Sequence, residues 1–146
     1  MIGDANSLNE RGLFYDIGKK MFLDNWFGIG AGNFTQAMQT YVDVKILPWQ
    51  FQPVHNIFVL VLNEIGIWGF AAFSGLFIYI GFYLLKLMKK ENIDKRFVAI
   101  LLALLLAIVV IGLFDHYFIS LYQGQALFWL YLGLISYVGL NKKELA

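Results

Sequence analysis

The sequence predicts an all-α integral membrane protein in which amphipathic helices and a loop on the outer face precede three transmembrane helices. Of its 146 residues, 60% are hydrophobic and only 14% are charged. Soluble domains usually carry about 25% charged residues, and a soluble fold of this composition would leave much apolar surface in water. The apolar residues also concentrate after residue 54, in stretches about as long as the roughly 20 residues that a helix needs to cross a bilayer.

The charge and cysteine content exclude several classes of function. The net charge is +1, which gives no indication of a nucleic-acid partner, and no cysteine is present for disulfides or thiolate metal sites. Residues 1–11 are polar and lack the apolar core of a cleavable signal peptide. Membrane insertion is therefore expected to begin at a later segment, or in sequence that precedes this chain.

The membrane topology follows from where the apolar and basic residues lie. Transmembrane helices are predicted at residues 67–88, 97–114 and 121–140. The connection at 89–96 and the tail at 141–146 are both basic, and three spans place them on one side of the membrane. The positive-inside rule assigns that side to the cytoplasm. Residues 1–54 and the short loop at 115–120 then lie at the outer face of the cytoplasmic (inner) membrane.

The outer segment is predicted to begin with an amphipathic helix. Ser7 and Glu10 have the spacing of a capping box, which predicts a helix start there and a helix that ends near Asn25. Apolar residues recur on one face of this helix, at Leu13, Ile17 and Met21.

Glycines follow this helix. Residues 28–33 predict a tight turn rather than a dinucleotide-binding loop, because no strand precedes them and the third glycine comes one position early. A second short helix is predicted from Asn33 to about Tyr41. Residues 47–53, with a proline near each end, predict an extended loop.

Residues 55–66 predict a short helix at the membrane interface with unusual polar residues in an apolar run. These polar residues are His55, Asn56, Asn63 and Glu64. Polar groups at membrane depth are costly and usually face a bundle interior or a water-filled cavity, where they serve function. Position alone equally supports the alternative that His55 and Glu64 are solvated near the headgroups. For Asp115 and His116, interfacial solvation is the favoured interpretation.

Three segments form a spaced pattern in the first half of the chain. They are the polar stretch that ends at Arg11, residues 24–34 (DNWFGIGAGNF) and residues 55–69 (HNIFVLVLNEIGIWG). Together with the predicted spans, this pattern resembles the O-antigen ligase and polymerase family of bacterial membrane glycosyltransferases. The resemblance covers about residues 6–80, and it departs from the family at Trp26, where a proline is usual. Family members have more transmembrane helices before the arginine, so the resemblance implies that this chain is a C-terminal part whose N-terminal helices are missing partners.

The resemblance also implies an activity. A glycan would pass from a polyprenyl diphosphate carrier to a sugar hydroxyl of an acceptor glycolipid or polysaccharide, in surface polysaccharide biosynthesis of the cell envelope. Arg11 matches the family's diphosphate-binding arginine, and its guanidinium suits phosphate oxygens. His55 matches the histidine that is proposed to deprotonate the acceptor hydroxyl, and imidazole is suited to this role. Asn56 and Glu64 are expected to support His55 or the acceptor. No metal or other cofactor is expected, because diphosphate is already a good leaving group.

Two other functions stay open on the sequence alone. The chain could be a non-catalytic membrane subunit or transporter fragment whose polar residues bind a partner helix, with Gly69, Gly75 and Gly81 serving helix packing. It could also be an inactive truncated product. The sequence does not distinguish a ligase from a polymerase.

Overall fold

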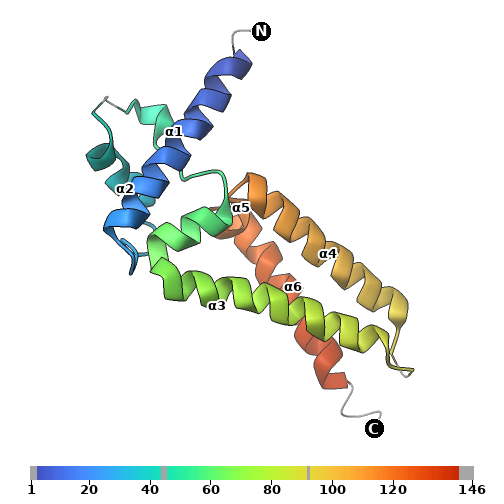
Figure 1. The fold of residues 1–146 in the computed structure, drawn as a ribbon. Coiled ribbons are helices and arrows are strands. Elements are labelled where there is room, and N and C mark those ends of the chain that lie inside the picture. The colour runs from blue at the N-terminus through green and yellow to red at the C-terminus, as the bar shows by residue number, and fades with distance from the viewer. Residues whose placement is uncertain (1–2, 44–45, 92, 142–146) are drawn as a thin grey trace.

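A computed structural model of the chain describes residues 3–43, 46–91 and 93–141, and these residues form helices joined by turns (Figure 1). The elements are α1 (Gly3–Asp24), α2 (Phe34–Ala37), the 3₁₀ helices η1 (Met38–Tyr41) and η2 (Pro48–Gln50), α3 (Ile57–Met88), α4 (Lys95–Phe114), α5 (Tyr117–Ser120) and α6 (Tyr122–Asn141). The predicted all-α class is confirmed.

The helices α3, α4 and α6 form a bundle. Figure 1 shows α3 and α4 running antiparallel, with α6 crossing behind them. Asp94 begins α4, because its carboxylate accepts the backbone N–H groups of Arg96 and Phe97 at 2.9 and 3.3 Å. Apolar side chains from all three helices form the bundle core, among them Phe77, Ile80, Leu84, Leu87, Val98, Leu101, Leu105 and Ile135.

Two of the three predicted transmembrane spans have the length and apolar composition that crossing a membrane requires. Among the described residues, α3 and α4 are long and apolar enough to cross a membrane. Helix α6 has 20 residues, but it carries Gln123 and Gln125 near its start and falls short of the same apolar character. The third span therefore stays a prediction. The predicted tail at 141–146 lies beyond the described residues except for Asn141.

A second core lies between α1 and the short helices. The predicted apolar face of α1 is largely correct: Ile17 and Met21 are fully buried, and Leu13 packs against the same cluster. The helix ends at Asp24, one residue before the predicted end. The predicted start is wrong. A capping box requires Ser7 to precede the first helical residue, but the backbone is already helical from Gly3.

The predictions for the shorter elements agree in part with the structure. The second short helix is present as α2 followed by η1. The loop at 47–53 is not wholly extended, because proline fits the first position of a helical turn and η2 begins at Pro48. In that turn the Gln50 side-chain oxygen accepts the backbone N–H of Leu47 at 3.0 Å. The predicted outer loop at 115–120 contains the short helix α5.

Helix α3 is broken where the sequence predicted a helix end. Gly66 has φ 72° and ψ −174°, so α3 consists of two helices joined at a kink that is visible in Figure 1. A kink leaves backbone groups without their partners in the helix. The predicted interface helix is thus the first arm of α3, which starts at Ile57, two residues later than predicted.

The glycine-rich turn after α1 satisfies these backbone groups. The backbone N–H groups of Ile29 and Gly30 donate to the carbonyl oxygens of Asn63 and Glu64 at 3.0 and 2.9 Å. The N–H of Ile67 donates to the carbonyl oxygen of Trp26 at 3.0 Å. These bonds join the turn at 24–34 to the kink.

Glycine is required where the two backbones meet. Gly28 has a φ of 87°, and a Cβ atom at this position would lie 2.5 Å from the carbonyl oxygen of Glu64. Gly66 has a positive φ and would collide with the backbone of Phe27 in the same way. A side chain at either position would push the turn away from α3. The contact therefore fixes how α1 is oriented on the first arm of α3.

Candidate functional site

His55 lies where the chain enters α3, on the side of α1. Its ring packs on Phe14 of α1 with the ring centroids 6.3 Å apart. The side chain is 18% exposed, and its Nδ1 atom is buried without a hydrogen-bond partner among the described residues. The imidazole is therefore held by packing, with one nitrogen free to take a partner.

The neighbouring Asn56 fixes the start of α3. Its side-chain oxygen accepts the backbone N–H groups of Phe58 and Val59 at 2.9 and 3.1 Å, which makes it the N-cap. Its side-chain N–H donates to the carbonyl oxygen of Leu113 at 3.1 Å. Asn56 thereby joins the first turn of α3 to the last turn of α4.

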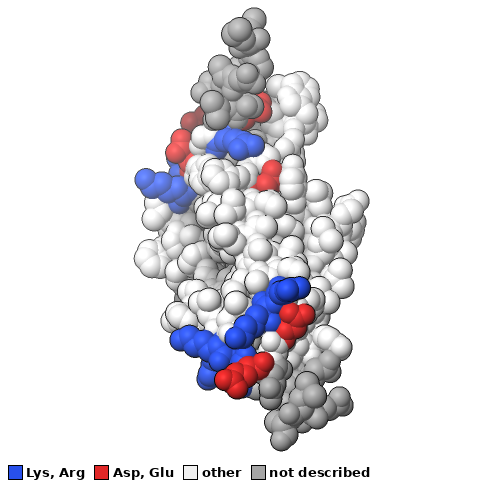
Figure 2. Space-filling view, turned by 90° about the vertical axis from the view of Figure 1, so that its right-hand side faces the viewer, with Lys and Arg blue, Asp and Glu red and all other residues white. Residues whose placement is uncertain are grey.

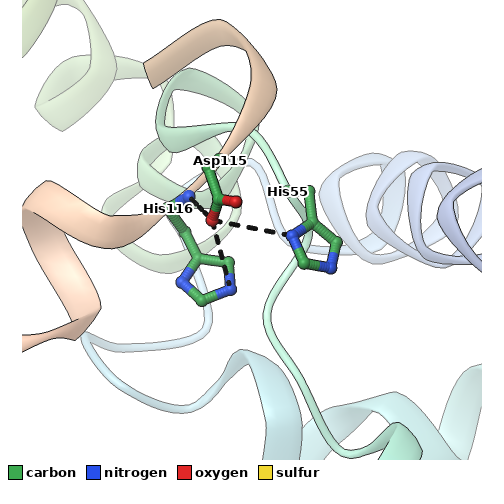
Figure 3. Close-up of side chains that lie close together, drawn as sticks. All are labelled: His55, Asp115 and His116. Atoms are coloured by element: carbon green, nitrogen blue, oxygen red, sulfur yellow. Dashed lines mark hydrogen bonds and ion pairs between the residues drawn. The ribbon is translucent and has the colours of Figure 1, made fainter. Parts of the chain in front are cut away.

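This connection brings Asp115 to His55. Helix α4 ends at Phe114, and the next residue is Asp115. The Oδ1 atom of Asp115 lies 3.6 Å from Nδ1 of His55 and 3.9 Å from Nε2 of His116. The two imidazole rings are 5.2 Å apart, and Figure 3 shows them on opposite sides of the carboxylate. Two histidines and one aspartate thus form a compact cluster, which we call the His–Asp–His cluster (His55, Asp115 and His116).

Ser120 contacts His116 at two points. The hydroxyl of Ser120 donates to the carbonyl oxygen of His116 at 3.0 Å. Its oxygen also lies in close contact with Nδ1 of His116. In the tautomer with the proton on Nδ1, Ser120 accepts that N–H and the lone pair lies on Nε2, the nitrogen 3.9 Å from Oδ1 of Asp115. Burial lowers the pKa of His116, partly offset by the negative charge of Asp115, and so favours the neutral ring.

Arg11 lies near this cluster. It is exposed on α1, one turn before Phe14, which contacts His55. The charge and hydrogen bonding of Asp115 raise the pKa of the exposed Tyr117, and the positive charge of Arg11 acts in the opposite direction. Arg11 therefore lies on the helix that packs against His55.

The contacts of Glu64 are with the glycine turn and α2. Its carboxylate accepts the backbone N–H of Phe34 at 3.3 Å, and its carbonyl oxygen accepts the N–H of Gly30. These contacts hold the glycine turn and α2 against α3. Of the two predicted supporting residues, Asn56 lies beside His55, whereas the contacts of Glu64 are with the turn.

Comparison with known proteins identifies the family. The O-antigen ligase family matches residues 2–74, which is half of the chain. The chain belongs to the O-antigen ligase family. The resemblance predicted from the sequence pattern is thus confirmed. Comparisons with curated proteins and with solved structures gave no significant match. Family membership and two helices able to cross a membrane identify an O-antigen ligase-like membrane protein of surface polysaccharide synthesis.

The residues matched to the O-antigen ligase family include Arg11 and His55 but not Asp115 and His116. The sequence interpretation of the latter two as solvated interfacial residues misses their position, because His116 is only 8% exposed and the Asp115 side chain 14%. One signal in the sequence pointed to them. An Asp-His pair directly follows an apolar span, and it contains the only histidine besides His55.

Proposed function

We propose that this chain is the C-terminal portion of an O-antigen ligase-like glycosyltransferase. It transfers a glycan from a polyprenyl diphosphate carrier to an acceptor sugar hydroxyl at the outer face of the cytoplasmic membrane. The observation that carries the proposal is the contact between His55 and Asp115, 3.6 Å apart, on the side of the molecule where Arg11 lies. A proton acceptor oriented by a carboxylate, beside a cation, is what this transfer requires.

The transfer proceeds in one displacement. The oxygen of the acceptor hydroxyl attacks the anomeric carbon of the glycan, and its proton passes to His55. The bond from that carbon to the diphosphate breaks, and the diphosphate leaves with the electron pair. Arg11 stabilises the negative charge on the leaving group with a charge-assisted fork of N–H donors.

In this proposal the two nitrogens of His55 have separate roles. Nδ1 faces Asp115, so a proton on Nδ1 is favoured by the carboxylate, and Nε2 then carries the lone pair. Nε2 is the atom that accepts the proton of the acceptor hydroxyl. Asp115 stabilises the imidazolium that forms and holds the ring in position.

The distribution of charge supports the membrane arrangement in this proposal. Figure 2 shows charged side chains at the two ends of the molecule, with an uncharged band between them. One end carries Lys86 of α3 together with Lys95 and Arg96 of α4, and the other carries α1. The positive-inside rule favours a cytoplasmic location for the first end. Helix α6 is then the third span and returns the chain to the cytoplasmic side.

The proposal includes partners in the membrane. The family resemblance implies further transmembrane helices before Arg11, and the lipid-linked donor would bind between these helices and the cluster. The acceptor glycolipid or polysaccharide approaches from the outer side. The assay is therefore made with this chain joined to the helices that precede it in its own gene.

The test is a transfer assay with a purified polyprenyl diphosphate glycan and an acceptor glycolipid. His55→Ala is expected to lower the rate about 10²–10⁴-fold, the usual contribution of a general base. His55→Gln keeps hydrogen bonding but accepts no proton, so it is expected to be nearly as inactive. Gln36→Ala, at an exposed position on α2, is the matched control and should retain the parent rate.

The outcome distinguishes the alternatives. Substantial transfer by His55→Gln, with the protein inserted normally, would overturn the role of His55 as base. A non-catalytic subunit predicts instead that no variant at this position changes a transfer rate.

A further inference from the structure

We propose that the His–Asp–His cluster binds a divalent transition-metal ion, with Zn²⁺ as the representative ion, and that the bound metal inhibits the enzyme. The proposal of a binding site rests on the geometry of the cluster. The inhibitory effect rests in addition on the proposed function of His55 as base.

Three ligand atoms converge in the cluster. One ligand atom each of His55, Asp115 and His116 lies within 4.8 Å of the other two. The carboxylate oxygen is 3.6 Å from the first nitrogen and 3.9 Å from the second. Bond lengths of about 2.0–2.1 Å in a tetrahedral site place ligand atoms about 3.4 Å apart. These two pairs are a few tenths of an ångström wider than that, and the ligand nitrogens, which lie within 4.8 Å of each other, would move closer together on binding.

Both nitrogens can offer a lone pair to a metal. Nδ1 of His55 is buried and has no hydrogen-bond partner among the described residues. Nδ1 of His116 is in close contact with Oγ of Ser120, which can accept its N–H, and Nε2 then offers its lone pair on the side of the carboxylate. A histidine ligand whose other ring nitrogen is hydrogen-bonded is the usual arrangement in metal sites. Figure 3 shows the two rings converging on the carboxylate.

The donor set determines the class of metal. Two imidazoles and one carboxylate suit Zn²⁺ and related transition metals, whereas Mg²⁺ and Ca²⁺ prefer oxygen ligands alone. Oδ1 of Asp115 already accepts the backbone N–H of His116 at 2.7 Å, which holds the carboxylate in place. Three protein ligands leave a fourth position for water.

Metal binding is incompatible with the proposed role of His55. Coordination through Nδ1 requires a lone pair on that atom, so the proton of the neutral ring moves to Nε2. Nε2 is the atom that accepts the proton of the acceptor hydroxyl. The metal is therefore an inhibitor and not a cofactor, and removing it with a chelator should raise the transfer rate or leave it unchanged.

Binding is tested on the full chain in detergent, purified with a tag that contains no histidine and titrated with Zn²⁺ by calorimetry. We expect one ion per chain. His116→Gln and Asp115→Asn should each weaken binding at least about tenfold, because each removes a ligand. Asp43→Asn is the matched control, because it removes an exposed carboxylate outside the cluster. Equal Zn²⁺ affinity of the parent and the two ligand variants would overturn the proposal.

Two further measurements keep the test decisive if a ligand variant folds poorly. Co²⁺ bound to the unmodified chain should give the intense visible absorption of a tetrahedral site, and a weak octahedral spectrum would overturn the proposal. Ser120→Ala leaves all three ligands in place but frees Nδ1 of His116, so it should weaken Zn²⁺ binding by about 10–100-fold.

The activity measurement separates the two proposals. Zn²⁺ added at its measured dissociation constant should halve the transfer rate of the parent protein. If His55→Gln retains transfer, the proposed function fails, yet the stoichiometric binding of Zn²⁺ still tests the site. If Zn²⁺ binds without lowering the rate, only the inhibitory role is overturned.

Discussion

The imidazole of His55 lies 3.6 Å from the carboxylate of Asp115, although α3 and α4 separate the two residues in the chain. His55 precedes the first turn of α3, and Asp115 follows the last turn of α4. Because these helices are antiparallel, the two ends meet on the side of the molecule next to α1 (Figure 1). This pairing is the basis of the predictions that concern activity.

Asp115→Asn tests the orienting role of the carboxylate. The amide has a similar shape but no negative charge to stabilise the imidazolium, so kcat should fall by about 10²-fold with little change in KM. Asp43→Asn removes an exposed carboxylate elsewhere and should retain the parent kcat. A change confined to KM would show that Asp115 acts on substrate binding instead.

Arg11 is predicted to bind the donor diphosphate. Arg11→Ala should abolish transfer in the chain that includes the preceding helices, and Arg11→Lys should restore little because the planar fork is lost. Lys19→Ala is a control that removes an exposed cation from the same helix. Near-normal turnover of Arg11→Ala would exclude the proposed role.

Asn56 is predicted to affect transfer through its hydrogen bond to Leu113 and stability through its role as the N-cap of α3. Asn56→Asp keeps the acceptor for the backbone N–H groups of α3 but cannot donate to the carbonyl oxygen of Leu113. Stability should change little, whereas transfer should fall roughly tenfold or more, because small displacements of catalytic groups are costly. Asn56→Ala should in addition lose about 1 kcal/mol of stability with the cap.

The two measurements distinguish the roles of Asn56. Thermal unfolding in detergent reports the cap, and the transfer assay reports the position of His55 relative to Asp115. If Asn56→Asp transfers at the parent rate, the bond to Leu113 does not position the site.

The glycine turn provides a prediction about stability. Gly28→Ala should destabilise the fold by more than the ~1–3 kcal/mol of an unfavourable positive φ, because its Cβ would also meet the carbonyl oxygen of Glu64. Gly32→Ala isolates the backbone cost, since its φ is 77° and no atom lies within 4 Å of the added Cβ. Thermal unfolding of both variants measures the difference. Equal destabilisation would mean that the close contact with Glu64 contributes nothing.

Membrane topology can be tested directly, because the chain contains no cysteine. Gln36→Cys on α2 should react with an impermeant thiol reagent in intact cells, whereas Glu91→Cys, after the end of α3, should react only after permeabilisation. Both positions are exposed. Labelling of Glu91→Cys in intact cells would contradict the proposed orientation.

The amino-acid sequence by itself determined the elements whose signals are local. Long apolar runs predicted the spans at α3 and α4, helical periodicity predicted the buried face of α1, and Gly66 marked the break in α3. A local signal misled where a longer helix overrode it, as at Ser7. The spaced pattern that contains Arg11 and His55 was sufficient to predict the family, because its segments lie within the matched residues.

Tertiary structure alone decided which residues surround His55. Asp115 and His116 looked like solvated residues of a short loop, since nothing local in the sequence reports that α4 ends beside the start of α3. The bond from Asn56 to Leu113 and the contact of His55 with Phe14 are long-range, and they depend on how the helices pack. Helix positions follow from local composition, but a cluster built from the ends of separate helices exists only once packing has brought those ends together.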